Sequence, residues 1–200
     1  MTFTAMLMAG GLSRRMGSDK ASLEVGGEAL WARQVRVLRE LTPAAVWVSA
    51  RATPAWCPRD LEVVLDERPS RGPLSGLTAA LTRLRTTHLL VLAIDLPGIS
   101  SGHLRKLQQL ASPGRGVLPL NQDYYEPLCA VYPTEAVSAA QTALRHGELS
   151  LQNLAQALVR DSLALAYKLE PPEREYYQNL NHRSDARRFE EALGMRERPV

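Results

Sequence analysis

The sequence predicts a three-layer α/β/α fold in which helices cover both faces of a mostly parallel, mixed β-sheet. Apolar runs alternate with amphipathic stretches from the beginning of the chain, a pattern typical of βα units. Several runs are continuously apolar, as expected of strands whose two faces are both covered. We predict strands at residues 3–8, 45–49, 61–65, 88–94, 116–120 and 126–132.

Helical spacing and capping residues predict the helices between these strands. Leu30, Val35 and Leu38 recur at helical spacing, and Pro73 suits the first turn of a helix that extends to residue 85. The pair Pro171-Pro172 indicates a turn, after which residues 176–180 are expected to return to the sheet. We expect N-caps at Ser100 or Ser101, Thr134, Ser150 and Ser184, for helices that reach residues 110, 146, 159 and 194.

The composition indicates a soluble, cytoplasmic protein with one domain over residues 1–200. A chain of this length buries a substantial core without disulfides. Cys57 and Cys129 lie far apart and form no C-x-x-C motif, which favours a reducing compartment. No basic leader is present and no window approaches the about 18 apolar residues of a membrane span. We therefore expect no contact with a membrane.

The charge pattern argues against a nucleic-acid partner. The formal net charge is only +3, although the sequence pI is about 9.1, and the arginines are scattered over several predicted helices. Aromatic residues make up 6% of the chain and do not alternate with basic residues, so a stacking platform for single strands is not indicated. The anionic partner is expected to be a small molecule.

The segment that follows the first predicted strand has the composition of a phosphate-binding loop. Residues 9–20 read AGGLSRRMGSDK. Small residues let the backbone approach a ligand, and such a loop can direct several N–H groups at one anion. Two arginines and a lysine follow the glycines and supply fixed positive charge. This combination suits a nucleoside triphosphate.

The spacing of the glycines excludes the two best-known nucleotide motifs. The dinucleotide fingerprint G-x-G-x-x-G is not formed by Gly10, Gly11 and Gly17. Counting from Gly11, Met16 stands where a P-loop would have its second glycine. An ordinary Rossmann oxidoreductase and a P-loop kinase are therefore both disfavoured.

Two aspartates end predicted strands at the edge where α/β sheets bind their ligands. Asp66 follows the strand at 61–65 and Asp95 follows the strand at 88–94. A carboxylate in this position can hold Mg²⁺ while the nucleotide supplies other ligands, and we predict this role for Asp95. For Asp66, capping of the following turn is an equal alternative. Residues 67–76 then enter a helix whose N-terminal amides could face a nucleotide.

In this order, the motifs resemble those of the molybdenum cofactor guanylyltransferase (MobA) family within the nucleotidyltransferase superfamily. The resemblance extends over nearly the whole chain. It is carried by AGGxSRRMGxDK at 9–20, RGPLSGL at 71–77, DLP at 95–97, EPLCAVY at 126–132, GELSL at 147–151 and NLN at 179–181. The family usually continues the last motif with Thr-Pro-Glu-Asp, whereas this chain continues with His182-Arg183-Ser184-Asp185.

The resemblance implies a Rossmann-like nucleotidyltransferase fold and a Mg²⁺-dependent activity. GMP would be transferred from GTP to the terminal phosphate of molybdopterin or its molybdenum-bearing form, with release of pyrophosphate. Apo-proteins of molybdoenzymes, or other proteins of cofactor biosynthesis, would be further partners.

The resemblance also assigns roles to residues of this chain. The nucleotide would be bound by Met8, Ala9, Gly10, Gly11, Arg15, Lys20, Ser49, Asp66, Gly72, Pro73 and Asp95. Of these, Arg15, Lys20 and Asp95 would be catalytic, Asp66 would help to seat the guanosine, and Asp95 would bind the metal. Asn179 and Asn181 would face the acceptor or the metal.

Two alternatives remain open at the level of sequence. One is a cytidylyltransferase that acts on the same pterin, although the doublet Gly10-Gly11 is more like the guanylyl enzymes. The other is a non-catalytic protein that binds nucleotide or delivers the cofactor, and the presence of both Lys20 and Asp95 argues against it.

Overall fold

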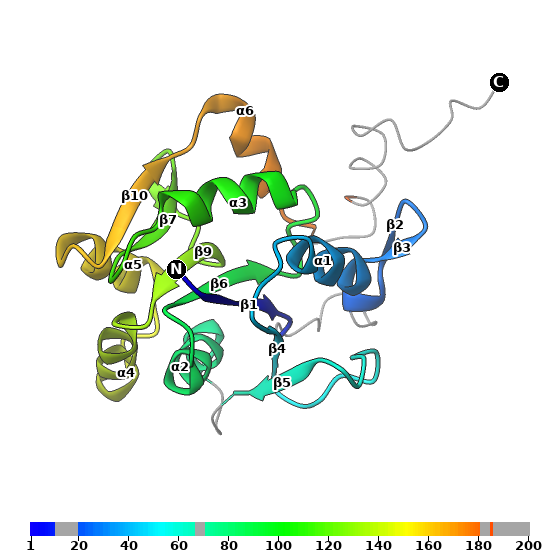
Figure 1. Cartoon of the computed structure of the whole chain (residues 1–200), viewed down its shortest axis with the longest axis horizontal. Helices are drawn as coiled ribbons and strands as arrows, with labels where there is room; N and C mark the ends of the chain where they lie inside the picture. The colour runs from blue at the N-terminus through cyan, green and yellow to red at the C-terminus, as the bar shows by residue number, and fades with distance from the viewer. Residues whose placement is uncertain (11–19, 67–70, 181–184, 186–200) are drawn as a thin grey trace.

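Helices cover both faces of one eight-stranded mixed sheet in the computed structural model, which describes residues 1–10, 20–66, 71–180 and 185 (Figure 1). The predicted fold class is thereby confirmed. The sheet contains β1 (Phe3–Met8), β4 (Val46–Ala50), β5 (Glu62–Leu65), β6 (His88–Ala93), β7 (Gly116–Asn121), β8 (Tyr124–Tyr125), β9 (Cys129–Pro133) and β10 (Ala164–Lys168). A separate hairpin pairs β2 (Glu24–Val25) with β3 (Glu28–Ala29).

The helices follow the strands in the order expected for βα units. They are α1 (Leu30–Arg39), α2 (Pro73–Arg83), α3 (Ser101–Leu110), α4 (Ala136–His146), α5 (Leu151–Arg160) and α6 (Pro171–Arg174), with 3-10 turns η1 (Lys20–Ser22) and η2 (Glu175–Tyr177). Helices α1 and α3 cover one face of the sheet, and α2, α4 and α5 cover the other (Figure 1).

The strand directions bring the ends of distant segments to one edge of the sheet. The strand order is β10-β7-β9-β6-β1-β4-β5, and β9 is antiparallel to both β6 and β7. The other long strands are parallel to their remaining neighbours. The carboxyl ends of β1, β4, β5 and β6 therefore meet the amino end of β9, where Cys129 is paired with Leu92.

Burial on both faces explains the continuously apolar runs. In β1, Ala5 and Leu7 belong to the core beneath α1 and α3, whereas Met6 and Met8 belong to the core beneath α2, α4 and α5. Every residue of β1 is buried. Apolar side chains therefore predominate, because neither face of the strand meets water, and the one polar residue, Thr4, has its hydroxyl within 3.0 Å of the Thr86 hydroxyl.

The last part of the chain differs from the sequence expectation. Residues 176–180 do not form a strand: η2 is followed by extended chain up to Leu180. The segment that returns to the sheet is β10, at its edge and parallel to β7. The two prolines begin α6 rather than a turn. Proline has no backbone N–H group, and the first turn of a helix does not use these groups for hydrogen bonds within the helix.

The helix boundaries also correct one of the expected N-caps. Helix α4 begins at Ala136 with Glu135 as its N-cap, and Thr134 precedes it without a cap role. Ser100 and Ser150 do cap α3 and α5 through their side chains. The helix expected at 184–194 lies outside the described residues.

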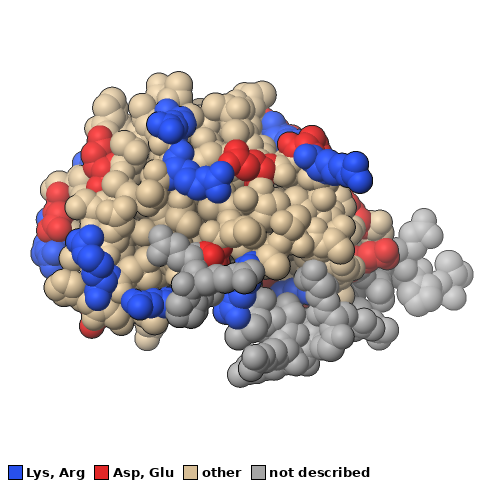
Figure 2. Space-filling view, turned by 90° about the horizontal axis from the view of Figure 1, so that it is seen from below, with Lys and Arg blue, Asp and Glu red and all other residues tan. Residues whose placement is uncertain are grey.

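Charges of both signs are interspersed on the molecular surface. Figure 2 shows Lys and Arg next to Asp and Glu over the face that it presents. Elsewhere in the chain, exposed charges are also paired, such as Arg160 with Asp161. The described part of this face displays no continuous basic stripe of the kind that follows a nucleic-acid backbone. None of the helices in the described ranges combines the length and apolar character needed to cross a membrane.

A partly buried polar network attaches the segment after β10 to α3. The Nε2 atom of His103 lies 2.7 Å from the Tyr177 hydroxyl. Lys106 donates to Oε1 of Glu173 at 2.8 Å, and the Tyr167 hydroxyl donates to Oε2 at 2.7 Å. These bonds hold α6 and η2 in place, so the chain that follows them is directed toward the carboxyl edge of the sheet.

Hydrogen bonds of the network keep Glu173 ionised, and burial favours the neutral form of His103. Burial alone would raise the pKa of Glu173, but hydrogen bonds from Lys106, the Glu170 amide and Tyr167 outweigh it and lower this pKa to about 2. Burial lowers the pKa of His103, although the Glu173 charge opposes this effect. The negative charge of Glu173 thus contributes to the attachment of this segment.

We expect Glu173→Gln to lower the free energy of unfolding in a pH-dependent way. Since the pKa of Glu173 lies below its ordinary value of 4.5, the contribution of its charge is present above about pH 4.5 and is lost as the pH falls toward 2. Urea unfolding of wild type and variant across this range should show a difference that shrinks with acidification. The control is Glu175→Gln, because Glu175 is an exposed neighbour. A difference in the free energy of unfolding between wild type and Glu173→Gln that did not change with pH would contradict the role of the charge.

Candidate functional site

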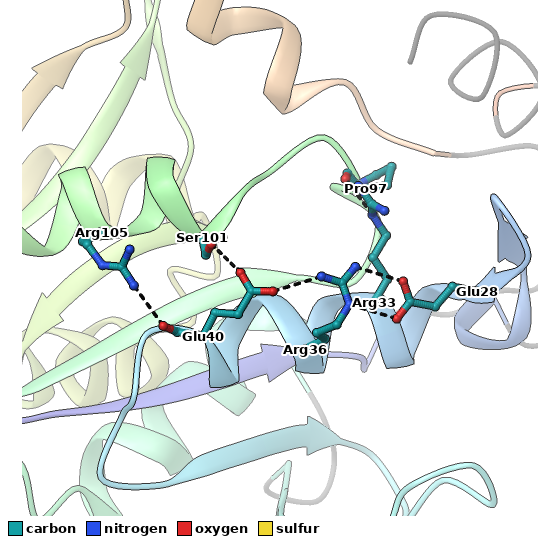
Figure 3. Close-up of polar contacts among 7 residues, drawn as sticks. All are labelled: Glu28, Arg33, Arg36, Glu40, Pro97, Ser101 and Arg105. Carbon is teal, nitrogen blue, oxygen red and sulfur yellow. Dashed lines mark hydrogen bonds and ion pairs between the residues drawn. The ribbon is translucent and has the colours of Figure 1, made fainter. Parts of the chain in front are cut away.

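The turn that carries Asp95 is fixed by side chains of α1. Gln34 is fully buried, and its Nε2 donates to the carbonyl oxygen of Leu96 at 2.8 Å. Arg33 donates through Nε to the carbonyl oxygen of Pro97 at 3.2 Å (Figure 3). Both bonds are made to backbone oxygens, so they set the path of the chain on either side of Asp95 and leave its carboxylate available.

Helix α1 is itself tied to its neighbours by a chain of polar contacts. Arg36 pairs with Glu28 of β3 and with Glu40, each at 3.0 Å (Figure 3). The hydroxyl of Ser101 donates to the Glu40 carboxylate at 2.6 Å, which lowers the pKa of Glu40. Arg105 donates to the carbonyl oxygen of Glu40 at 2.9 Å. The helix that holds the Asp95 turn is thereby linked to α3.

A second segment reaches the same turn from the far end of the chain. The amide of Leu180 donates to the carbonyl oxygen of Asp95 at 2.9 Å. A Cβ on Gly98 would lie 2.9 Å from the carbonyl oxygen of Tyr176, so only glycine allows this close approach. Asn179 precedes Leu180 and is exposed beside the turn, whereas Asn181 lies outside the described residues.

The structure brings Lys20 and Asp95 together although 75 positions separate them in the sequence. Nζ of Lys20 lies 3.1 Å from Oδ2 of Asp95, and the two side chains are 15% and 29% exposed. Both can therefore be reached by a ligand at the edge of the sheet. The predicted residues Gly11 and Arg15 lie outside the described part of the chain.

Four of the predicted nucleotide-binding residues meet around the start of α2. The Ser49 hydroxyl donates to Oδ1 of the buried Asp66 at 3.5 Å. A Cβ on Gly10 would lie 3.7 Å from Oδ2 of Asp66. A Cβ on Gly76 would lie 2.3 Å from Oγ of Ser49 and 3.3 Å from Sδ of Met8. A methyl group at Gly76 would therefore push apart the side chains that this group places together.

The remaining predicted residues border this group. Ala9 donates its amide to the carbonyl oxygen of Ser49 at 2.9 Å, which continues the pairing of β1 with β4. Gly72 is the N-cap of α2 with φ of 79°, a value that favours glycine, and Pro73 occupies the first turn. Arg71 donates to the carbonyl oxygen of Leu144 at 2.8 Å.

Sequence reasoning missed the residues that support the site. Gln34 interrupts the apolar face of α1 between Leu30 and Leu38, and a polar residue in such a position indicates a buried hydrogen bond. Gly76 stands inside a helix, where glycine is unfavourable unless close packing requires it. Both signals were present in the sequence. Arg33 carries no such signal, because an arginine beside a buried helix face is common.

The donor set around Asp95 fits a magnesium ion that the substrate helps to hold. Mg²⁺ is commonly bound by one or two carboxylates together with phosphate oxygens and water. Asp95 supplies one accessible carboxylate at the ligand-binding edge. Within residues 1–10, 20–66, 71–180 and 185, no group of three or more His, Cys, Asp or Glu could enclose an ion. A single accessible carboxylate of this kind fits a metal–nucleotide complex rather than an ion enclosed by protein ligands alone.

We expect Gly76→Ala to destabilise the protein by about 1–3 kcal/mol, because overpacking displaces Ser49 and Asp66. The matched control is Gly102→Ala in α3, where the new Cβ would meet only the Ser100 hydroxyl, at 3.7 Å. That variant should be as stable as wild type or slightly more stable. Urea unfolding of the three proteins makes the comparison, and equal stabilities of the two variants would contradict the packing argument.

The comparisons with known proteins agree with this architecture. The model of the MobA-like NTP transferase domain matches residues 5–163. A probable molybdenum cofactor guanylyltransferase of Opitutus terrae is 40% identical over 182 residues, 90% of each chain. The molybdenum cofactor guanylyltransferase of Pseudomonas fluorescens strain Pf0-1 is 36% identical over 77% of this chain and 82% of its own.

Solved structures share the fold. The molybdopterin-guanine dinucleotide biosynthesis protein A of Archaeoglobus fulgidus superposes with a TM-score of 0.73 at 22% identity, over 96% of this chain and 98% of its own. A nucleotidyl transferase of Methanothermobacter thermautotroptrophicus gives 0.76 at 17% identity, over 96% and 97% of the two chains. By its sequence and by the family model, the chain belongs to the MobA-like NTP transferase family.

Proposed function

We propose that this protein is a molybdenum cofactor guanylyltransferase, which transfers GMP from GTP to the terminal phosphate of molybdopterin and releases pyrophosphate. The observation that carries the proposal is the pair formed by Lys20 of η1 and Asp95 of the fixed turn after β6, with Nζ and Oδ2 3.1 Å apart. The names of the relatives from Opitutus terrae and Pseudomonas fluorescens support the choice of substrates.

The proposed reaction places few demands on proton transfer. An oxygen of the acceptor phosphate attacks the α-phosphorus of GTP, and the bond from that phosphorus to the oxygen shared with the β-phosphorus breaks. A phosphate monoester carries about −1.5 to −2 charges near pH 7, so no side chain has to deprotonate it. The difficulty is to bring two anions together and to stabilise the charge on the leaving pyrophosphate.

The residues of this chain suit that electrostatic task. Lys20 supplies a cation at the edge of the sheet, and the rigid mounting of Asp95 supplies a carboxylate that would hold Mg²⁺. When bound, Mg²⁺ neutralises phosphate charge and orients the triphosphate. The chain from Met8 to Gly10 would lie against the nucleotide, and Asp66 with Ser49 would help to seat the guanosine.

The two sides of Asp95 would divide the substrates between them. Strands β1, β4 and β5 lie on one side of β6, and Gly10, Ser49 and Asp66 lie on them or directly after them. The exposed Asn179 follows the network on α3 and would face the acceptor. The phosphates of both substrates would then meet at Lys20 and Asp95, where their repulsion is offset.

We expect incubation with GTP, Mg²⁺ and molybdopterin to yield the guanine dinucleotide, detected by mass, together with pyrophosphate. GTP should be used in preference to CTP. Product formed from CTP alone would instead identify a cytidylyltransferase. Thermal stabilisation by GTP without any release of pyrophosphate would identify a nucleotide-binding delivery protein.

We expect Lys20→Ala to lower turnover by about 100-fold to 1,000-fold, because one preorganised charge-stabilising contact is lost. Asp95→Ala should be at least as damaging, since the metal ligand is removed. Pyrophosphate release at saturating GTP, Mg²⁺ and acceptor measures both effects. Lys168→Ala, an exposed lysine at the end of β10, is the control. Unchanged turnover in either site variant would refute the role assigned to that residue.

A further inference from the structure

A second carboxylate stands at the same edge of the sheet, on the other side of Asp95 from the nucleotide-binding group. Glu126 precedes β9, whose first residue Cys129 is paired with Leu92 near the end of β6. Burial raises the pKa of the Cys129 thiol to about 12, and the nearby charge of Glu126 contributes to this. The same charge acts on Tyr177, which leads into the segment that carries Asn179.

The loop that carries Glu126 is held rigidly by its backbone. The amide of Glu126 donates to the carbonyl oxygen of Pro119 at 2.9 Å, and its own carbonyl oxygen accepts from Cys129 at 3.1 Å. The hydroxyl of the buried Tyr132 donates to the carbonyl oxygen of Pro127 at 2.7 Å. A side chain mounted on so constrained a backbone is suited to recognition, because little conformational freedom is lost on binding.

The carboxylate of Glu126 is only partly satisfied. Asn121, the last residue of β7, donates through Nδ2 to Oε1 at 3.0 Å. Within the described residues this is the one hydrogen bond to the carboxylate, so Oε2 remains available to a ligand. Burial raises the pKa of Glu126, and the Asn121 bond opposes this effect. A half-buried carboxylate with one donor gains from a ligand that presents further N–H groups.

We propose that Glu126, oriented by Asn121, recognises the pterin ring of the acceptor through its 2-amino-4-oxopyrimidine edge. This edge presents two neighbouring N–H donors, and a carboxylate accepts both of them. The inference rests on the proposed function, which makes a pterin the acceptor. The inference adds the residue pair, Glu126 and Asn121, that would distinguish a pterin phosphate from phosphate esters without a pterin ring.

Guanine presents the same pair of donors, so the position of Glu126 decides between the two rings. The strand order places β9 and β7 on one side of β6, and β1, β4 and β5 on the other. Glu126 and Asn121 belong to the first side, whereas Gly10, Ser49 and Asp66 belong to the second. The guanine would lie with the second group, which leaves the pterin for Glu126.

The test compares ligands that differ at one group. Neopterin monophosphate is a fluorescent pterin that carries the 2-amino group, and the corresponding lumazine has an oxygen in its place. Dissociation constants of both are measured by fluorescence for wild type, Glu126→Gln and Glu135→Gln. Glu135 is exposed and follows the opposite end of β9, which makes it a matched control. The preference for GTP over ITP, which lacks the 2-amino group, is measured in parallel by thermal stabilisation.

Wild type and Glu135→Gln should bind the pterin about 10-fold to 100-fold more tightly than the lumazine, and Glu126→Gln should lose this preference. The GTP preference should be the same in all three proteins. An unchanged pterin preference in Glu126→Gln, or a loss of its GTP preference instead, would overturn the inference. Because these are binding measurements, a wild type that formed no dinucleotide would refute the proposed function while the ligand ratios still decided the role of Glu126.

Discussion

The hydrogen bonds that fix the turn after β6 are the constraint on which the candidate site depends. Gln34 is buried to make one of them, although its Oε1 has no hydrogen-bond partner among the described residues. Burying an amide whose oxygen lacks a hydrogen bond costs free energy, so this position is unfavourable for the stability of α1 alone. The bonds that Gln34 makes hold the backbone around Asp95, together with donors from Arg33 and Leu180. The turn is thereby fixed from the helix layer on one side and from the end of the described chain on the other.

A fixed turn in this position divides the carboxyl edge of the sheet into two halves. The half formed by β1, β4 and β5 is compact, and Gly76 of α2 allows Ser49 and Asp66 to lie close to Gly10. The half formed by β9 and the segment after α6 depends on a polar network centred on Glu173. In the proposed function, two anionic substrates would approach from different directions, and the charged pair at the boundary would offset their repulsion.

The layers of the fold, and the polar residues that follow the strands, could be predicted from the sequence. Nearly continuous apolar runs predicted the central strands, because burial on both faces favours apolar side chains at almost every position. The edge strand β10 was missed because three of its five residues are only partly buried, which leaves a weak apolar pattern. Residues 176–180 were wrongly assigned to a strand, because their apolar positions serve contacts with α3 and with the Asp95 turn. Such contacts join segments far apart in the chain, and no local pattern encodes them.

In the proposed function, nucleotide and acceptor occupy opposite sides of Asp95. A crystal structure of the protein with a non-hydrolysable GTP analogue and Mg²⁺ would locate the nucleotide. We expect the guanosine beside Ser49 and Asp66, the triphosphate at Lys20 and Asp95, and the region in front of Glu126 left open. A guanosine bound against Glu126, with the region around Asp66 empty, would rule out this division of the substrates.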